Sequence, residues 1–217
     1  MAIEKHCYKT AAEWLKARTS YIGGSDAASI IGLSPWRNNV QLWQEKTGRK
    51  KHDNIDENPL VKYGHDAEPL LRELFALDAP EMKVQYEPWN MWTNDALPWA
   101  HASLDGWLTD PDGRFGILEI KTATINNGAH AAQWKDKIPD TYYCQLLHYF
   151  AVTEADFAVV VAQLKYPAAD QPYKKTLYVH IERSEVEEDI ATLIDAERIF
   201  AECVKEDKEP ALVLPNI

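Results

Sequence analysis

Three charged side chains stand among apolar residues in the segment SLDGWLTDPDGRFGILEIKTA, residues 103–123. Asp105 comes near its start, and Glu119 and Lys121 follow a turn rich in Asp, Pro and Gly. Residues i and i+2 of a strand point to the same face, so Glu119 and Lys121 project together, and a hairpin can bring Asp105 beside them. Charged groups half-buried in a sheet are costly unless they are paired or bind a metal.

Two interpretations of these residues remain open. In the first, the carboxylates bind Mg²⁺, which favours carboxylate oxygens and relieves their mutual repulsion. The lysine would then orient or deprotonate a water, or stabilise charge at a phosphate, which fits hydrolysis of a phosphodiester. In the second, Glu119 and Lys121 form a surface pair that contributes under ~1 kcal/mol. The Glu-x-Lys spacing alone is not specific, because it recurs at residues 81–83 and 206–208.

Helical and period-two patterns predict the elements that must position these residues. We expect helices at about 11–19, in GGSDAASIIGL, in SPWRNNVQLWQEKTGRK up to Gly48, from about 64 through 75, at about 141–152, and from the cap residue Ser184 onward. We expect strands in MKVQYEPWNMW, WAHASLDGWL, FGILEIKTA, FAVVVAQL and KKTLYVHIER. This order predicts an α/β (α+β) fold, a single domain over 1–217 with a mixed central sheet flanked by helices.

The long helix after residue 58 carries an apolar stripe and an internal proline. Proline lacks the N–H of a helix interior, so we expect a start near Gly64 that puts Pro69 in or near the first turn, or else a kink. The stripe predicted to be buried consists of Ala67, Leu70, Leu71 and Leu74.

Composition bounds the class of protein. The chain has 217 residues, of which 46% are hydrophobic, enough for one sizeable core. No apolar run approaches the roughly 20 residues that span a bilayer, so no membrane association is expected. The start MAIEKHCYKT lacks the apolar core of a signal peptide. Three widely spaced cysteines indicate no disulfide framework, and we expect a reduced, cytoplasmic protein.

The charge is unevenly spread along the chain. The net charge is −11, yet residues 1–52 carry nine Lys and Arg against four Asp and Glu. Residues 182–210 carry eleven acids against four bases. Screening over roughly 8–10 Å isolates a local basic patch from distant acids, so the acidic total does not exclude a nucleic-acid enzyme. The run GRKKHD at 48–53 is also typical of a solvated loop.

Six motifs occur in order within residues 11–150: EWLKARTSYIGGSDAASIIGLSPW, LWQEKTGR, YGHDAEPLLRELF, ASLDGWL, LEIKTA and YYCQLLHY. Together they resemble the phage-type exonucleases, the family of lambda exonuclease and the YqaJ-like viral recombinases. The resemblance implies the restriction-endonuclease-like core of the PD-(D/E)xK nuclease superfamily. The first acidic residue stands in SLDG rather than in Pro-Asp, a form common in this family.

The resemblance also implies roles for individual residues. Lys121 resembles the catalytic lysine, and Gln145 resembles the glutamine that follows the active-site strands, with Tyr142 one turn before it. The metal ligands implied are Asp105, Glu119, the backbone carbonyl of Ile120 and, in support, Glu68. The residues implied to hold a terminal 5′-phosphate or to bind DNA are Arg18, Ser25, the assisting Ser103 and Tyr142.

Each of these positions also has an ordinary structural interpretation. Glu68 could complement a helix dipole, and Arg18 could be a cation at a helix C-terminus. Gln145 could be a buried amide with satisfied hydrogen bonds. Ser25 is a typical helix cap.

The function implied by the resemblance is a Mg²⁺-dependent 5′–3′ exonuclease, with Mn²⁺ as a substitute ion. It would digest one strand of linear double-stranded DNA from a 5′-phosphorylated end to mononucleotides, leaving 3′ tails for recombination by strand annealing. The resemblance also implies a ring-shaped homotrimer, a phage single-strand annealing protein as partner, and a phage or prophage gene expressed in a bacterial cytoplasm. The alternatives are a related nuclease of other polarity or endonucleolytic habit, and a non-catalytic DNA-binding recombination module.

Overall fold

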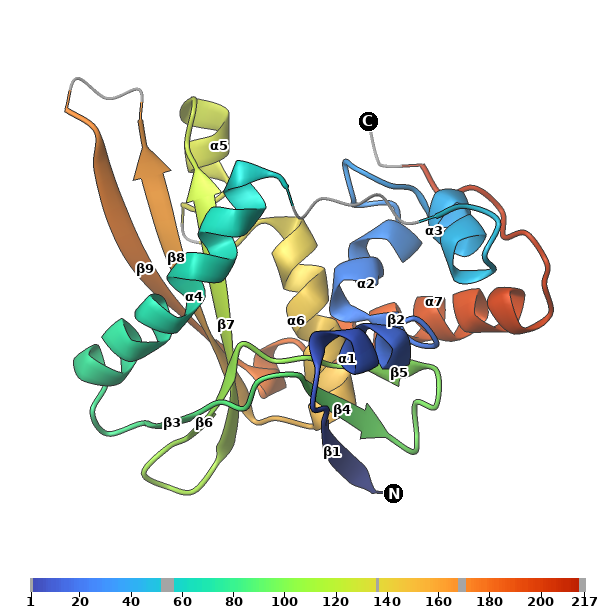
Figure 1. The fold of residues 1–217 in the computed structure, drawn as a ribbon, viewed down its shortest axis with the longest axis horizontal. Helices are drawn as coiled ribbons and strands as arrows, with labels where there is room; N and C mark the ends of the chain where they lie inside the picture. Colours follow the sequence, from blue (N-terminus) through green and yellow to red (C-terminus); the bar gives the residue numbers. More distant parts are fainter. Residues whose placement is uncertain (1, 52–56, 136, 168–170, 215–217) are drawn as a thin grey trace.

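A mixed five-stranded sheet occupies the left half of the molecule in the view of Figure 1. The computed structural model describes residues 2–51, 57–135, 137–167 and 171–214. The strands lie in the order β3-β6-β7-β8-β9. Their bounds are Lys83–Gln85, Gly106–Thr109, Phe115–Thr124, Phe157–Tyr166 and Tyr173–Glu182. The β7–β8 pair is parallel and the other pairs are antiparallel, which confirms the predicted mixed sheet.

Seven α-helices lie in the described residues. They are α1 Ala11–Arg18, α2 Gly24–Ile30, α3 Asn39–Lys46, α4 Pro59–Asp78, α5 Gly128–Ala132, α6 Asp140–Thr153 and α7 Glu187–Lys205. The segment that contains α5 and α6 makes the long crossover that the parallel β7–β8 pair requires. The α/β (α+β) fold class is confirmed. Across this described part of the chain, no helix combines the length and apolar character needed to cross a membrane.

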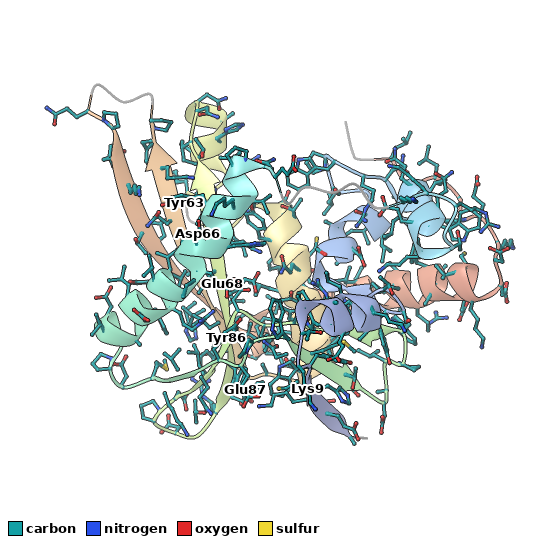
Figure 2. The ribbon with its side chains drawn as sticks, in the orientation of Figure 1. Lys9, Tyr63, Asp66, Glu68, Tyr86 and Glu87 are labelled. Carbon is teal, nitrogen blue, oxygen red and sulfur yellow. The ribbon has the colours of Figure 1, made fainter. Side chains whose placement is uncertain are left out.

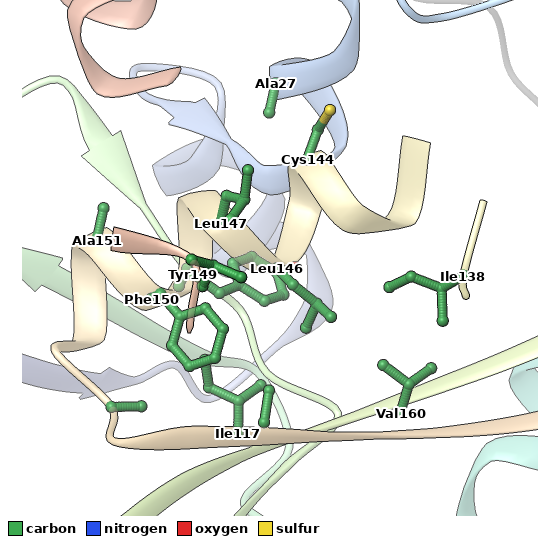
Figure 3. Close-up of a cluster of buried hydrophobic side chains, with 14 of the residues drawn as sticks. Ala27, Ile117, Ile138, Cys144, Leu146, Leu147, Tyr149, Phe150, Ala151 and Val160 are labelled. Atoms are coloured by element: carbon green, nitrogen blue, oxygen red, sulfur yellow. The ribbon is translucent and has the colours of Figure 1, made fainter. Parts of the chain in front are cut away.

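Helices cover both faces of the sheet because the central strand β7 is apolar on both sides. Leu118 and Ile120 pack against the buried side of α4. Ile117 belongs to the core on the opposite face, where α6 lies. Figure 3 shows Leu146 and Phe150 of α6 between this face of the sheet and α2. The alternation along β7 therefore directs Glu119 and Lys121 toward α6.

Two short strand pairs attach the N-terminal segment to the middle of the chain. β1 (Ile3–Cys7) pairs antiparallel with β4 (Asn90–Asn94), and β2 (Ile22–Gly23) pairs parallel with β5 (Ala100–His101). The prediction of one strand over 82–92 is wrong, because β3 and β4 belong to different sheets. The chain turns between them at Trp89, which has a φ of 57°.

The predicted strand over 99–108 is also interrupted, and the interruption contains Asp105. The side chain of Asn90 accepts the N–H of Leu104 at 3.0 Å and donates to the carbonyl of Leu104 at 2.9 Å. Between the end of β5 and the start of β6, the backbone of Leu104 is therefore held by a side chain and not by a neighbouring strand. Asp105 therefore lies at a bend directly before β6.

Helix α4 begins earlier than the sequence predicts. It starts at Pro59, capped by the side chain of Asn58, so the expected start near Gly64 is wrong. Proline is favourable at the first helical position because its missing N–H would have no partner there. Pro69 therefore lies inside the helix, where it removes one backbone hydrogen bond.

Fewer residues of the apolar stripe predicted on α4 are buried than expected. Ala67, Leu71 and Phe75, spaced four residues apart, face the sheet. Leu70 and Leu74 lie on the flank of this line and are 65% and 37% exposed. The prediction that these two leucines are buried is wrong.

Two further predictions need correction. Helix α7 is not capped by Ser184, because a 3-10 turn (Arg183–Glu185) precedes it and Val186 occupies the N-cap position. Helix α5 lies in a segment for which no helix is predicted, and the side chain of Asn127 caps it. The other predicted helices and strands are present, with small differences at their ends.

A buried ion pair ties α6 to α7. His148 Nδ1 lies 2.8 and 2.9 Å from the two carboxylate oxygens of Glu197, and His148 Nε2 lies 2.9 Å from the carbonyl oxygen of His101. Although burial lowers the pKa of His148, the Glu197 carboxylate and the His101 carbonyl both raise it, which favours the imidazolium form with both ring nitrogens protonated. Neither His148 nor Glu197 is exposed to solvent.

Candidate active site

Glu119, Lys121 and Gln145 form one hydrogen-bonded cluster between β7 and α6. Lys121 Nζ lies 2.6 Å from Glu119 Oε1 and 3.0 Å from Gln145 Oε1. Gln145 Nε2 donates to Glu119 Oε1 at 2.8 Å and to the hydroxyl of Tyr149 at 2.9 Å. The Tyr142 ring lies on the same side, with its centroid 4.8 Å from Lys121 Nζ. Glu119 is 1% exposed, so this is not a surface ion pair.

Asp105 reaches this cluster from the bend before β6. Its Oδ2 accepts the backbone N–H of Ile120 at 2.8 Å, which places the carboxylate at the strand position between Glu119 and Lys121. The register that pairs Gly106 with Leu118 produces this approach.

Glu68 belongs to α4 (Figure 2), and it is close enough to Asp105 for the charge of Asp105 to act on it. Its carboxylate forms an ion pair with Arg72 one turn later on the helix. Arg72 also donates from Nε to the backbone carbonyl of Asp105 at 2.7 Å, and its guanidinium lies 3.6 Å from the centroid of the Tyr86 ring. Arg72 thus connects the acidic residue of α4 to the bend that carries Asp105.

The crowding of carboxylates in buried surroundings raises their pKa values. Burial, assisted by Asp105, raises the pKa of Glu119 to about 8, although Lys121 opposes the shift. Burial and Asp105 likewise raise the pKa of Glu68 to about 7, against Arg72 and Lys121. Burial also raises the pKa of Asp105. Burial would lower the pKa of Lys121, but Glu119 and Asp105 outweigh it and raise that pKa, so the lysine keeps its proton.

Two of these carboxylates are suited to a divalent cation. Glu119 Oε1 accepts two hydrogen bonds, whereas Glu119 Oε2 is buried without a hydrogen-bond partner. Mg²⁺ is commonly bound through one or two carboxylates together with waters and substrate phosphates, so Asp105 and Glu119 fit this ion. Among the residues that the structure describes, no group of three or more His, Cys, Asp or Glu side chains is arranged to hold a metal. Metal ligation by Asp105, Glu119, Glu68 and the Ile120 carbonyl stays a prediction.

Arg18, Ser25 and Ser103, which are predicted to hold a phosphate, lie beside the cluster of Glu119, Lys121 and Gln145. Within the described residues, no hydrogen bond joins these three to one another. The guanidinium of Arg18, at the end of α1, lies 4.1 Å from the centroid of the Trp14 ring. Burial lowers the pKa of Arg18, while Tyr149, Asp26 and Asp105 oppose the shift, so this cation belongs to the electrostatic surroundings of Asp105.

Ser25 and Ser103 emerge at the same end of the β2–β5 pair. The pair is parallel with Gly23 opposite His101, and each serine follows its strand residue by two positions. Ser25 is exposed, whereas the Oγ of Ser103 is buried without a hydrogen-bond partner.

Gly24 allows the start of α2 to pack closely against α6. A Cβ atom at Gly24 would lie 2.5 Å from Cε1 of Tyr149 and 2.9 Å from Cγ of Gln145. Real Cβ atoms do not approach other atoms this closely, so the start of α2 can rest on α6 only with glycine at this position.

Two contacts of the site were not predicted from the sequence. Tyr149 accepts from Gln145, and Arg72 pairs with Glu68. Each stands four residues after a predicted site residue on the same helix, so the i, i+4 rule could have indicated both.

Comparison with known proteins agrees with the motif order. The family described as the YqaJ-like viral recombinase domain matches residues 13–156. The uncharacterized protein YqaJ of Bacillus subtilis (strain 168) is 29% identical in an alignment of 160 residues that covers 71% of this chain and 47% of that protein. The chain thus spans about half the length of the curated relative that it matches.

Solved structures agree in fold. The alkaline exonuclease LHK-Exo from Laribacter hongkongensis has a TM-score of 0.64 and 18% identity, covering 91% of this chain and 94% of that one; its complex with dAMP gives the same values. A phage related exonuclease from Haemophilus somnus 129PT has a TM-score of 0.55 and 15% identity, covering 87% and 96%. With a family match over residues 13–156, the chain belongs to the YqaJ-like viral recombinase domain family.

Proposed function

We propose that this protein is a Mg²⁺-dependent 5′–3′ exonuclease, with Mn²⁺ as a substitute ion. It digests one strand of linear duplex DNA to mononucleotides and leaves 3′ single-stranded tails. The observation that carries the proposal is the buried cluster of Glu119, Lys121 and Gln145 beside Asp105. The family match and the exonuclease names of two proteins with the same fold support it.

In this proposal the carboxylates bind the cation, and the lysine acts on the attacking water or on the phosphate. Asp105, Glu119 and the Ile120 carbonyl hold the cation, and Glu68 supports them through Arg72. A bound Mg²⁺ would polarise the scissile phosphate and lower the pKa of a coordinated water. Lys121 has three N–H groups, of which two are used by Glu119 and Gln145. The third is left to position the attacking water or to stabilise charge on a phosphate oxygen.

Arg18, with Ser25 and Ser103, is proposed to grip the 5′-phosphate of the digested strand. We expect Arg18→Ala to lower the rate ratio between 5′-phosphorylated and 5′-hydroxyl duplexes about tenfold or more, because a hydrogen bond to a charged group contributes roughly 1.5–3 kcal/mol. Initial rates on the two substrates measure this ratio. Lys16→Ala, in the same helix, should keep the wild-type ratio. An unchanged ratio in Arg18→Ala would refute the assignment.

Gly24→Ala should disturb the site through Gln145 and Tyr149, the two side chains of α6 that lie against Gly24. The added methyl group displaces Gln145 and Tyr149, which costs about 1–3 kcal/mol of stability and loosens the hold on Lys121. We expect a lower melting temperature and a digestion rate reduced about tenfold or more. The matched control is Gly128→Ala, also at the first position of a helix, where a Cβ meets no atom within 4 Å. Wild-type melting and rate in Gly24→Ala would contradict the packing argument.

A homotrimer ring and a phage single-strand annealing partner belong to the same proposal. The flank of α4 supports self-association, because Leu70 and Leu77 are 65% and 77% exposed. Sedimentation should give about three times the 24.8 kDa mass of one chain. A monomer at working concentration would count against the ring.

The proposal is tested with 5′-phosphorylated linear duplex and a covalently closed circle, each with Mg²⁺ and with EDTA. We expect acid-soluble mononucleotides from the linear substrate only, and only with Mg²⁺. Nicking of the circle would indicate an endonuclease, and loss of a 3′ label first would indicate the opposite polarity. If both substrates stay intact in Mg²⁺ and in Mn²⁺, the protein is a non-catalytic DNA-binding module.

A further inference from the structure

The far half of the β8–β9 hairpin carries positive charge that the proposed active site does not use. We call its described residues, 163–167 and 171–176, the β8–β9 arm. It lies at the edge of the molecule, next to α5 in the view of Figure 1. The arm contains Lys165, Lys174 and Lys175, and these described residues include no Asp or Glu. The chain as a whole has 34 acids against 23 bases, so the arm is a local exception.

Two of these lysines are gathered around one tyrosine of α4. Lys165 Nζ lies 3.7 Å from the centroid of the Tyr63 ring, and Lys174 Nζ lies 5.2 Å from it. Lys174 Nζ also donates to the Tyr63 hydroxyl at 3.0 Å, and that hydroxyl donates to the side chain of Gln163. Two ammonium groups are thus fixed close together although like charges repel.

No carboxylate of the described residues lies within 4.0 Å of the ammonium group of Lys165 or Lys174. Nearby, Asp66 pairs with Lys62 at 2.8 Å. The tyrosine ring contributes only about 0.5–1 kcal/mol at an exposed site, which does not offset the charge. A pair of positioned cations without an acidic partner is suited to an external anion.

The lysine pair lies on the α4 side of the sheet, a few residues away from Glu68 and Lys121. Tyr63 precedes Glu68 by five residues on α4, about 7.5 Å along the helix axis, and Figure 2 shows both on this helix. On the sheet, Lys165 lies opposite Thr124, three residues or about 10 Å beyond Lys121 along the strand, but it faces α4, whereas Lys121 faces α6. Each strand of DNA rises about 3.4 Å per nucleotide, so the offset corresponds to about three nucleotides.

The opposite side of the arm is basic as well. A groove there is lined by Trp134, Lys135, Lys137, Tyr166 and Lys175, among others. Lys137 lies 3.6 Å from Asp140, and both are exposed, so this pair leaves the lysine accessible. The lysines of the arm therefore point to both of its sides.

The arrangement of the aromatic rings in and next to the arm indicates whether it would bind duplex or single-stranded DNA. Binding of a single strand normally uses open aromatic faces on which bases stack. Here the Tyr63 ring is approached by two ammonium groups, and the rings of Tyr166 and Tyr173 stack on each other at 4.5 Å. Tyr173 is 51% exposed, but one face of its ring is covered by Tyr166, so the arm offers mainly positive charge, which binds phosphates and not bases.

We propose that the β8–β9 arm, with Tyr63, binds the phosphate backbone of the duplex that is still to be digested. Lys165 and Lys174 each contact one phosphate. The inference rests on the proposed function, since it assigns the arm a place on the same substrate. Its role is to keep the duplex aligned with the active site between successive cuts.

The test is the salt dependence of binding to a fluorescent linear duplex, measured by anisotropy in EDTA. Each phosphate contact contributes about 0.9 to the slope of log affinity against log salt, so Lys165→Ala/Lys174→Ala should lower the slope by about 1.8. Between 50 and 200 mM salt the double variant should lose about tenfold less affinity than wild type. The matched control is Lys205→Ala/Lys208→Ala, which removes the same charge from two exposed positions on or just after α7.

The outcomes separate this inference from the proposed function. A smaller slope in the arm variant alone, with wild-type melting behaviour, supports the arm as a duplex-binding surface. Equal slopes in wild type and both variants, while wild type still digests linear duplex, would overturn the inference and leave the function standing. A slope change seen with a single strand and absent with duplex would also overturn it. Wild type that neither binds nor digests DNA would refute the function itself.

Discussion

Replacing Lys121 by Ala should reduce digestion of linear duplex DNA by about 10²–10⁴-fold, the usual contribution of a positioned proton-transfer or charge-stabilising group. The reason is geometric, because Lys121 is held by Glu119 at 2.6 Å and by Gln145 at 3.0 Å. The pKa of Glu119 is already raised to about 8, so its carboxyl can take up a proton when the lysine is removed. The variant should therefore remain folded.

Single-turnover rates on a 5′-phosphorylated duplex measure this effect, and anisotropy in EDTA shows whether binding is retained. The matched control is Lys5→Ala, since Lys5 also pairs with a glutamate at 2.8 Å but on the surface. It should digest DNA at the wild-type rate. A Lys121→Ala enzyme within about tenfold of wild type would remove Lys121 from the mechanism.

The second large effect concerns stability. Glu197→Ala should destabilise the protein by about 3–5 kcal/mol, because it leaves the imidazolium of His148 buried without its counterion. Urea unfolding at pH 6 measures this loss. The control on the same helix is Glu202→Ala, whose exposed pair with Arg198 contributes about 0.5 kcal/mol or less. If Glu197→Ala were as mild as Glu202→Ala, His148 would not be charged in the folded state.

The same pair predicts a pH dependence with a definite sign. Burial lowers the pKa of His148, but Glu197 and the His101 carbonyl, with a further contribution from Asp26, outweigh it and raise the pKa. Stability from a raised pKa is fully present below the ordinary value of about 6.5 and is lost as the pH rises through the raised value. The stability difference between wild type and Glu197→Gln should therefore be largest near pH 6 and shrink at higher pH.

The sequence predicts the part of the site that follows from strand periodicity. Glu119 and Lys121 share a face because side chains alternate along β7, and Asp105 is brought near by the β6–β7 register. These are local relations over fewer than 20 residues. The clustering of Gln145 with Glu119 needs the packing of α6 on the sheet, and only the family resemblance gave it in advance.

The failures share a different cause. β1 and β2 were missed because they are short and exist through pairing with β4 and β5, far along the chain. The strand over 82–92 was overextended because its pattern does not reveal the left-handed turn at Trp89. Leu70 and Leu74 fit a helical apolar stripe, yet they are exposed, and it is the line of Ala67, Leu71 and Phe75 that packs against the sheet. Burial depends on the position of the facing element, which periodicity does not contain.

The pairing of β1 with β4 and of β2 with β5 also bears on how the protein folds. Each joins segments separated by more than 70 residues, as the pair of Ile22 with Ala100 illustrates. Closing such long loops costs chain entropy before any contact is gained, and folds dominated by distant contacts reach the native state in milliseconds to seconds. Arg18 and Gly24 lie in this N-terminal segment, so competence for catalysis should appear as a late kinetic phase, after the central sheet has condensed.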